Sequence, residues 1–274
     1  MQLAKLVIVA GTCLAVRSAA AQPVPQIEGM KTVLPAVLPT ATGATFDGRL
    51  DYVHLSESDN APTIFALKLH GQYVAPQGIG GYLSLPVAYV SDDGESDSYV
   101  GNIELGGLYM FRGANVDAYA RVGAALDVGA NDEIDTFVLP IVSLTAHPAD
   151  AVTTGFGSSW LRAGGGARFT SGALVLGGSL GVDVPIGDSE FVENLDNLLN
   201  LSVAVGLTQP GFGVAVGFTV VELLGEGDND SLKTVQVTGD FEIAPQMRLY
   251  GVLGANFDDD SEGFSLGAGV RATL

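Results

Sequence analysis

The sequence is poor in cysteine and in basic residues. Of 274 residues only Cys13 is a cysteine, and 12 are Lys or Arg against 31 Asp or Glu. A single Cys excludes both an intramolecular disulfide scaffold and a Cys-based zinc site. The formal net charge of -19 argues against general nucleic-acid binding, because affinity for phosphate comes from Lys and Arg.

Long apolar runs are also missing. Leu6–Val16 is apolar for eleven residues, which is too short to span a bilayer. This run follows Lys5 and precedes Ala19 and Ala21, a pattern that predicts a secretory signal peptide over residues 1–21. Cys13 lies inside the run after Thr12, a poor match to a lipoprotein site. No apolar run near 18 residues follows, which excludes a helical membrane protein.

What the chain does have is apolar content, glycine and two-residue alternation. Hydrophobic residues make up 47%, Gly counts 37 and the mean hydropathy is +0.34, so disorder is excluded. Residues 172–184 and 198–209 alternate apolar with small or polar side chains, as strands with two different faces do. The pattern predicts twelve strands, over residues 46–55, 63–74, 79–90, 99–111, 116–128, 157–170, 173–184, 198–209, 212–224, 232–244, 247–257 and 264–274.

The connections between these strands alternate between short and long. The short ones carry turn residues, such as Pro76, Gly113 and Pro210. The long ones are acidic, over residues 56–62, 91–98, 129–156, 185–197, 225–231 and 258–263. Together these six loops hold 21 Asp or Glu and no Lys or Arg, so the net charge of the chain belongs to one set of loops.

A soluble β-sandwich would also alternate. Three features favour a membrane barrel: strands of ten or more residues, the strict segregation of short turns from long loops, and a chain that ends on its last strand. A sheet in lipid must close, because an open edge leaves backbone groups unpaired. We therefore predict an all-β fold, a transmembrane antiparallel up-and-down β-barrel of about 12 strands over residues 45–274.

In this architecture the chain resembles the Gram-negative outer-membrane β-barrel superfamily, without a family-specific motif. The last strand, residues 264–274, is similar to the C-terminal insertion signal of that superfamily, although it ends on Leu274 rather than on Phe. The resemblance implies the outer membrane as location, short periplasmic turns and long extracellular loops. It also implies contact with outer-membrane lipids and lipopolysaccharide.

Aromatic residues at the strand ends agree with this orientation. Two belts are expected where the barrel crosses the membrane interfaces. The belt near the short turns contains Phe46, Tyr73, Tyr109, Phe111, Phe169, Phe212 and Phe241, and the belt near the long loops contains Tyr52, Phe65, Tyr89, Tyr99, Phe257 and Phe264.

The inward parity of the strands collects charges of both signs. The predicted lumen-lining residues are Asp47, Arg49, Asp51, Lys68, Glu104, Arg121, Arg162, Arg168, Asp183, Asp240, Glu242, Arg248 and Arg271. Many inward Gly and Ala leave volume, and barrels well above eight strands are not filled by side chains alone. Two hypotheses follow, a water-filled pore with charged walls and a plugged lumen crossed by salt bridges.

Two segments could fill such a lumen. Residues 22–44 are rich in Pro and mildly apolar, and form either a periplasmic lead or an insert in the barrel. The loop 129–156 contains the apolar stretch 137–144, which should fold inward, extend a hairpin above the membrane or add a strand. The even strand count favours twelve strands without it.

The long loops predict an acidic mouth. Its residues are Asp92, Asp93, Glu95, Asp97, Glu226, Asp228, Asp258, Asp259, Asp260 and Glu262. Carboxylates suit Ca²⁺ or Mg²⁺, although no loop matches a known calcium-binding signature. Weak cation binding, bridging to lipopolysaccharide, and a merely solvated rim all remain open.

One pair offers an enzymatic alternative. His54 and Ser56 share one strand face, and they resemble the His and Ser of outer-membrane lipid hydrolases. An orienting Asn on the next strand has no counterpart, so we predict no enzyme and no cofactor. The leading hypothesis is a passive porin-like channel for small polar solutes with a cation-favouring mouth. The alternative is a structural or surface-interaction barrel with a plugged lumen that binds divalent cations, lipopolysaccharide or a partner.

Overall fold

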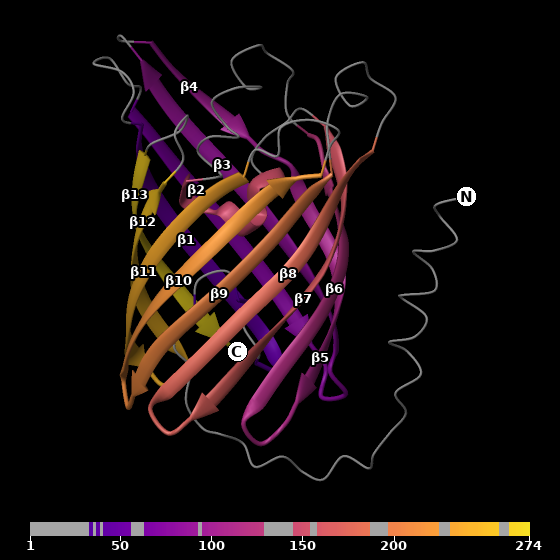
Figure 1. Cartoon of the computed structure of the whole chain (residues 1–274), viewed down its shortest axis with the longest axis vertical. Coiled ribbons are helices and arrows are strands. Elements are labelled where there is room, and N and C mark those ends of the chain that lie inside the picture. Colours follow the sequence, from indigo (N-terminus) through magenta and orange to yellow (C-terminus); the bar gives the residue numbers. More distant parts are fainter. Residues whose placement is uncertain are drawn as a thin grey trace.

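The computed structural model is a closed antiparallel β-barrel (Figure 1). It describes residues 33–34, 37–38, 41–55, 63–92, 95–128, 145–153, 158–186, 197–224, 231–257 and 263–274. Strand β1 pairs with β2 on one side and with β13 on the other, from Thr45 opposite Thr273 to Leu55 opposite Gly263. The first and last strands therefore close the sheet, which removes the unpaired edges that lipid would not tolerate.

The strands follow the chain order around the barrel. They are β1 Gly43–Leu55, β2 Thr63–Val74, β3 Ile79–Asp92, β4 Glu95–Val100, β5 Ile103–Arg112, β6 Val116–Leu126, β7 Ser159–Ser171, β8 Leu174–Ile186, β9 Leu198–Gln209, β10 Phe212–Leu223, β11 Ser231–Ala244, β12 Met247–Asn256 and β13 Gly263–Thr273. A short 3₁₀ helix, η1 Pro148–Thr153, lies between β6 and β7.

One predicted strand is divided. The expected strand 99–111 is two strands, because the strand structure ends at Val100 and begins again at Ile103. β4 pairs only with residues 87–92 of β3, and β5 then pairs with residues 79–84 of the same strand. At the break, Nδ2 of Asn102 donates to the carbonyls of Val152 and Ser158, both at 2.8 Å. β4 is thus an extension above the ring, and the closed barrel has twelve strands.

The alternation in sequence becomes an inside and an outside. On β9, Val203 is 53% exposed on the outer surface, while the neighbouring Ser202 is 3% exposed and points into the barrel. The outer surface carries large apolar side chains all around the barrel, as a lipid-facing surface requires. Aromatic residues such as Tyr73 and Phe257 lie at its two ends, but Tyr99, expected in the outer belt, packs partly buried against Val53 and Ile64.

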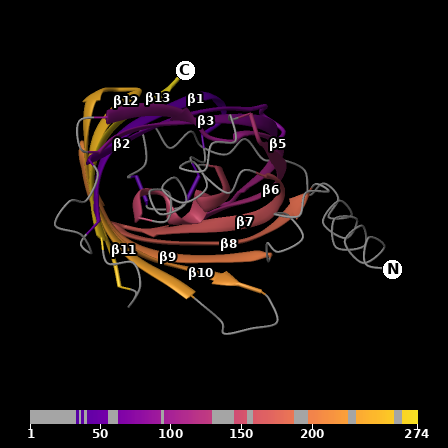
Figure 2. The ribbon, with the colours of Figure 1, turned by 90° about the horizontal axis from the view of Figure 1, so that it is seen from above.

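The two ends of the barrel differ. Tight turns join β2 to β3, β7 to β8 and β9 to β10 at one end, here called the turn end (Figure 1). Gly78, Gly172 and Gly211 adopt positive φ there, a conformation that a side chain would strain. The opposite end is here called the loop end, and η1 enters the barrel from it, lying inside the ring of strands when seen from above (Figure 2).

Within the described part of the chain, no helix is long and apolar enough to cross a membrane.

Candidate functional site

The interior of the barrel is lined by ion pairs. The structure places all thirteen side chains that parity predicted to face inward in buried or partly buried positions: Asp47, Arg49, Asp51, Lys68, Glu104, Arg121, Arg162, Arg168, Asp183, Asp240, Glu242, Arg248 and Arg271. Arg271 Nε donates to Asp47 at 2.6 Å, Arg49 Nε donates to Asp51 at 2.8 Å, and Arg248 pairs with Asp240. Pairing of this kind offsets the cost of taking charges out of water.

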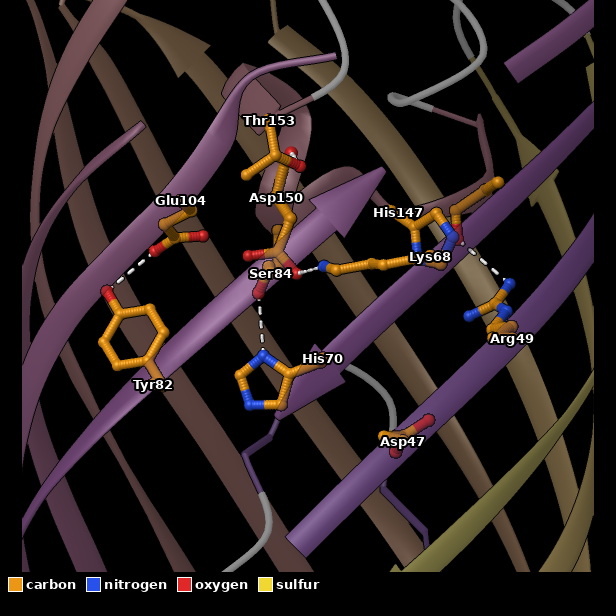
Figure 3. Close-up of polar contacts among 12 residues, drawn as sticks. Asp47, Arg49, Lys68, His70, Tyr82, Ser84, Glu104, His147, Asp150 and Thr153 are labelled. Atoms are coloured by element: carbon orange, nitrogen blue, oxygen red, sulfur yellow. Dashed lines mark hydrogen bonds and ion pairs between the residues drawn. The ribbon is translucent and has the colours of Figure 1, made fainter. Parts of the chain in front are cut away.

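The segment 145–153, here called the plug, folds into this interior from the loop end. Its central residue is Asp150 on η1, which forms an ion pair with Lys68 of β2 (Figure 3). Asp150 Oδ1 also lies 3.2 Å from Arg162 Nη1 and 3.5 Å from Arg121 Nη2. One carboxylate of the plug therefore binds cations from three different strands. Burial acts to raise the pKa of Asp150, but Lys68, Arg162 and Arg121 hold that pKa well below its usual range.

The rest of the plug is held through its backbone. The carbonyl of Ala146 accepts from Arg49 Nη2 at 3.0 Å and from Gln236 Nε2 at 2.9 Å. The carbonyl of Ala149 accepts from Arg162 Nη2 at 3.0 Å. Backbone groups that are buried away from water need hydrogen-bond partners. Side chains of the wall supply these partners to two carbonyls of the plug.

His147 is the second titratable group of the plug. Its Nε2 lies 3.0 Å from Oδ2 of Asp51, a carboxylate that also binds Arg49. Burial, and then the charge of Arg49, lowers the pKa of His147, although Asp51 acts in the opposite direction. The neutral imidazole is therefore the form that the closed interior favours.

A second insert lies nearer the turn end. Residues 33–34 and 37–38, here called the strap, lie inside the barrel, and Val33 N–H donates to Asp240 Oδ2 at 3.0 Å. Leu34 and Val37 pack in an apolar cluster whose wall residues are Val74, Tyr82, Leu108, Met110, Tyr119, Val175, Ala204 and Ala215. The strap leaves little room, since a Cβ built on Gly177 would come within 2.7 Å of Leu34 Cδ1.

A partly open cavity, here called the chamber, lies between the strap and the plug. Its volume is about 130 Å³. The floor is formed by the apolar strap residues Val33, Leu34, Val37 and Leu38, and the roof by His147, Ala149 and Asp150. The walls include Lys68, His70, Ser84, Arg121, Asn200 and Arg271. His70 and Ser84 are joined by a 2.7 Å hydrogen bond between Nδ1 and Oγ (Figure 3).

Most of the predicted acidic mouth lies outside the described residues. This applies to Asp93, Glu226, Asp228, Asp258, Asp259, Asp260 and Glu262. Asp92 and Glu95 pair at the tip of the β3–β4 hairpin, and Asp97 is exposed on β4. Among the residues with described positions, no group of three or more His, Cys, Asp or Glu could hold a metal ion.

The His54 and Ser56 pair has only one described member. His54 packs its ring against Phe264 on β13, with 5.1 Å between the ring centroids. Ser56 lies outside the described residues.

Sequence reasoning missed the residues that close the interior. His147 and Asp150 lie in the predicted acidic loop 129–156, and little in the sequence singles them out from the other residues of that loop. The one available signal is the sequence His147-Pro148-Ala149-Asp150, which follows the apolar stretch 137–144. It does not indicate which residues of the wall these side chains contact. The strap was recognised only as one of two alternatives for residues 22–44, and the described strap residues have the inserted arrangement.

Comparison with known proteins agrees with the architecture. No protein-family model matches the sequence, and no curated protein is similar to it. Among solved structures, an outer-membrane channel from Pseudomonas putida F1 has a TM-score of 0.63 at 15% identity, over 92% of this chain and 100% of that one. The NanC porin has a TM-score of 0.56 at 11% identity, over 84% and 100% of the two chains.

A third structure, the KdgM porin in complex with disordered oligogalacturonate, has a TM-score of 0.50 at 9% identity, over 84% and 99% of the two chains. Identities this low carry the fold alone. The chain has the fold of the outer-membrane β-barrel porins and channels.

Proposed function

We propose that this protein is an outer-membrane diffusion channel for small polar solutes, exported by a signal peptide over residues 1–21. The observation that carries the proposal is the chamber, a partly open space inside the barrel that lies between the strap and the plug and has both polar and apolar lining. The solved structures of similar fold support the proposal, because they are channels and porins.

In this proposal the plug and the strap are the two closures of one path. The plug and the strap are segments of the same chain as the wall, and the contacts that hold them inside it are hydrogen bonds, ion pairs and apolar packing. Movement of both would join the chamber to the solvent at the two ends. Motions of loops and of chain segments on the microsecond to millisecond scale are common in proteins.

The acidic loops set the ion preference of the proposed channel. A mouth that carries many carboxylates raises the local concentration of cations and steers their entry. The effect falls with ionic strength, because the screening length is about 8 Å at 0.15 M salt. We therefore propose that K⁺ is preferred over Cl⁻ at low salt, and that divalent cations and lipopolysaccharide associate with the same loops.

Conductance in planar bilayers tests the proposal. The full mature chain should give discrete current steps, and the reversal potential in a KCl gradient should show preference for K⁺. Current steps with a preference for Cl⁻ would contradict the proposed role of the acidic mouth, but they would still support a channel.

The filled interior favours one second candidate, a barrel that is permanently closed and acts through its surface. Absence of current steps in every salt would support that candidate. A lipid hydrolase using His54 and Ser56 is a minor alternative. It requires phospholipid hydrolysis that His54→Ala and Ser56→Ala each abolish.

A further inference from the structure

The charged side chains that line the chamber are already engaged. Lys68 binds Asp150, Arg271 binds Asp47, and Arg49 binds Asp51. Arg121 lies 3.8 Å from Glu104 and 3.5 Å from Asp150. A charged guest would lose its hydration and would have to break one of these pairs to find a counter-charge, which is costly in a buried space.

Two polar atoms at the chamber wall have no hydrogen-bond partner in the described structure. They are Nε2 of His70 on β2 and Oδ1 of Asn200 on β9. Both side chains are more than nine-tenths buried. The other atom of each is satisfied, since His70 Nδ1 bonds Ser84 and Asn200 Nδ2 donates to Asp183 at 2.6 Å. Buried polar atoms are seldom left without a partner, so a small shift of either side chain that brings its atom to the chamber would be stabilised by a hydrogen bond to a guest.

The chamber also has an apolar side. Leu34, Val37 and Leu38 of the strap form the floor. The volume of about 130 Å³ is close to that of an engineered protein cavity of about 150 Å³ that holds benzene. The chamber thus fits a molecule of roughly one small ring.

We propose that the chamber is a binding site for a small neutral amphipathic solute, with an apolar body on the strap and a hydroxyl or similar polar group toward His70 or Asn200. The inference rests on the proposed function for its biological meaning, since it names the class of solute that the channel would hold. The binding itself requires only the closed structure. It can therefore be tested without any current through the barrel.

Equilibrium dialysis of the full mature chain in detergent provides the test. The probes are benzyl alcohol, benzoate and benzylammonium at pH 7, which share a ring and differ in charge. Benzyl alcohol should bind saturably at one site per chain, at least tenfold more tightly than either charged probe. Tighter binding of benzoate or benzylammonium would overturn the proposal, and so would the absence of saturable binding by benzyl alcohol.

Two variants localise the site. His70→Phe keeps an aromatic ring beside Tyr82 and removes Nε2, and binding of benzyl alcohol should weaken about fivefold to tenfold, as expected for one lost hydrogen bond. Leu34→Trp adds a ring to the floor and should abolish saturable binding. Because Leu34 belongs to the strap and not to a strand, the barrel itself keeps its sequence.

Leu207→Trp is the matched control, since Leu207 is 54% exposed on the outer surface. The probe partitions into detergent equally in all these samples. Differences in binding between the variants therefore report binding in the chamber. Wild-type binding in both His70→Phe and Leu34→Trp would overturn the assignment. Binding without current steps would retain the site and refute the channel, while current steps without binding would do the reverse.

Discussion

Asp150 Oδ1 on the plug lies 3.2 Å from Nη1 of Arg162 on β7, and Arg162 in turn binds Glu104 at 2.6 Å and Asp183 at 2.8 Å. This contact attaches the plug to an ion-pair network that belongs to the wall. The same plug is also held through the carbonyls of Ala146 and Ala149, so the contacts of Asp150 are the charged part of its attachment. We propose that the strength of this charged part decides how often the barrel is open at its loop end.

Replacement of Asp150 by Asn should release the plug. Hydrogen bonds to charged groups contribute about 1.5–3 kcal/mol, so the ratio of open to closed barrel should rise by about 10–150-fold. Single-channel recording measures this ratio directly. Asp97→Asn, which removes an exposed acid on β4, is the control and should leave the ratio within about twofold. Equal open fractions in the two variants would refute the role of Asp150.

The strap should respond to crowding at Gly177. A Cβ at this position would lie 2.7 Å from Leu34 Cδ1 and 3.2 Å from Val37 Cγ2. Gly177→Val should therefore displace the strap and make residues 33–38 accessible to added protease in folded protein. Gly239→Val is the matched control, because a Cβ there has no atom within 4 Å. A strap that is equally protected in wild type and in Gly177→Val would argue against the described packing.

Closure should weaken as the pH falls. The pKa of His147 lies below its ordinary value of 6.5 in the closed barrel, and the groups that face this histidine are Asp51, Arg49 and Lys68. A histidine with a lowered pKa stabilises the closed state fully above about pH 6.5, and loses that contribution as the pH falls toward the lowered value. Asp150 stays ionised in this range, because its pKa is held well below the usual range.

The open fraction of the wild-type barrel should therefore rise between pH 7 and pH 5 in single-channel recordings. His147→Gln has no titrating ring and should show a flatter profile over the same range. An unchanged pH profile in His147→Gln would show that another group controls the response.

The outer surface offers a test of membrane insertion. Val203 lies in the middle of β9 and is 53% exposed, so Val203→Arg places a charge against lipid. An Arg near the bilayer midplane costs about 2–4 kcal/mol in barrels of this kind. Urea unfolding in lipid vesicles should report this loss. Lys233→Arg, at an exposed position near the loop end, should change the unfolding free energy by less than about 0.5 kcal/mol.

The strands could be predicted because alternation is a local signal. Residues 198–209 contain the whole pattern of β9, and β9 has those bounds in the structure. The division between β4 and β5 could not be predicted in this way. Asn102 lies at this division, and its partners Val152 and Ser158 are 50 and 56 residues away in sequence.

The closures of the barrel are likewise long-range. Lys68 and Asp150 are 82 residues apart, and Val33 and Asp240 are 207 residues apart. The alternation of inward and outward side chains predicts that Lys68 and Asp240 face the interior. It cannot predict that they bind Asp150 and Val33, because the plug and the strap have no periodic pattern. The sequence thus predicts which charged residues line the wall. The contacts of the plug and the strap are seen only in the three-dimensional structure.

We propose above all that this barrel conducts and that the plug closes it. The most direct measurement is single-channel current through the mature wild-type chain and through Asp150→Asn, side by side in planar bilayers in KCl. Our account predicts brief, discrete openings for the wild type and long openings for Asp150→Asn. No current steps from either protein at any salt concentration would contradict it.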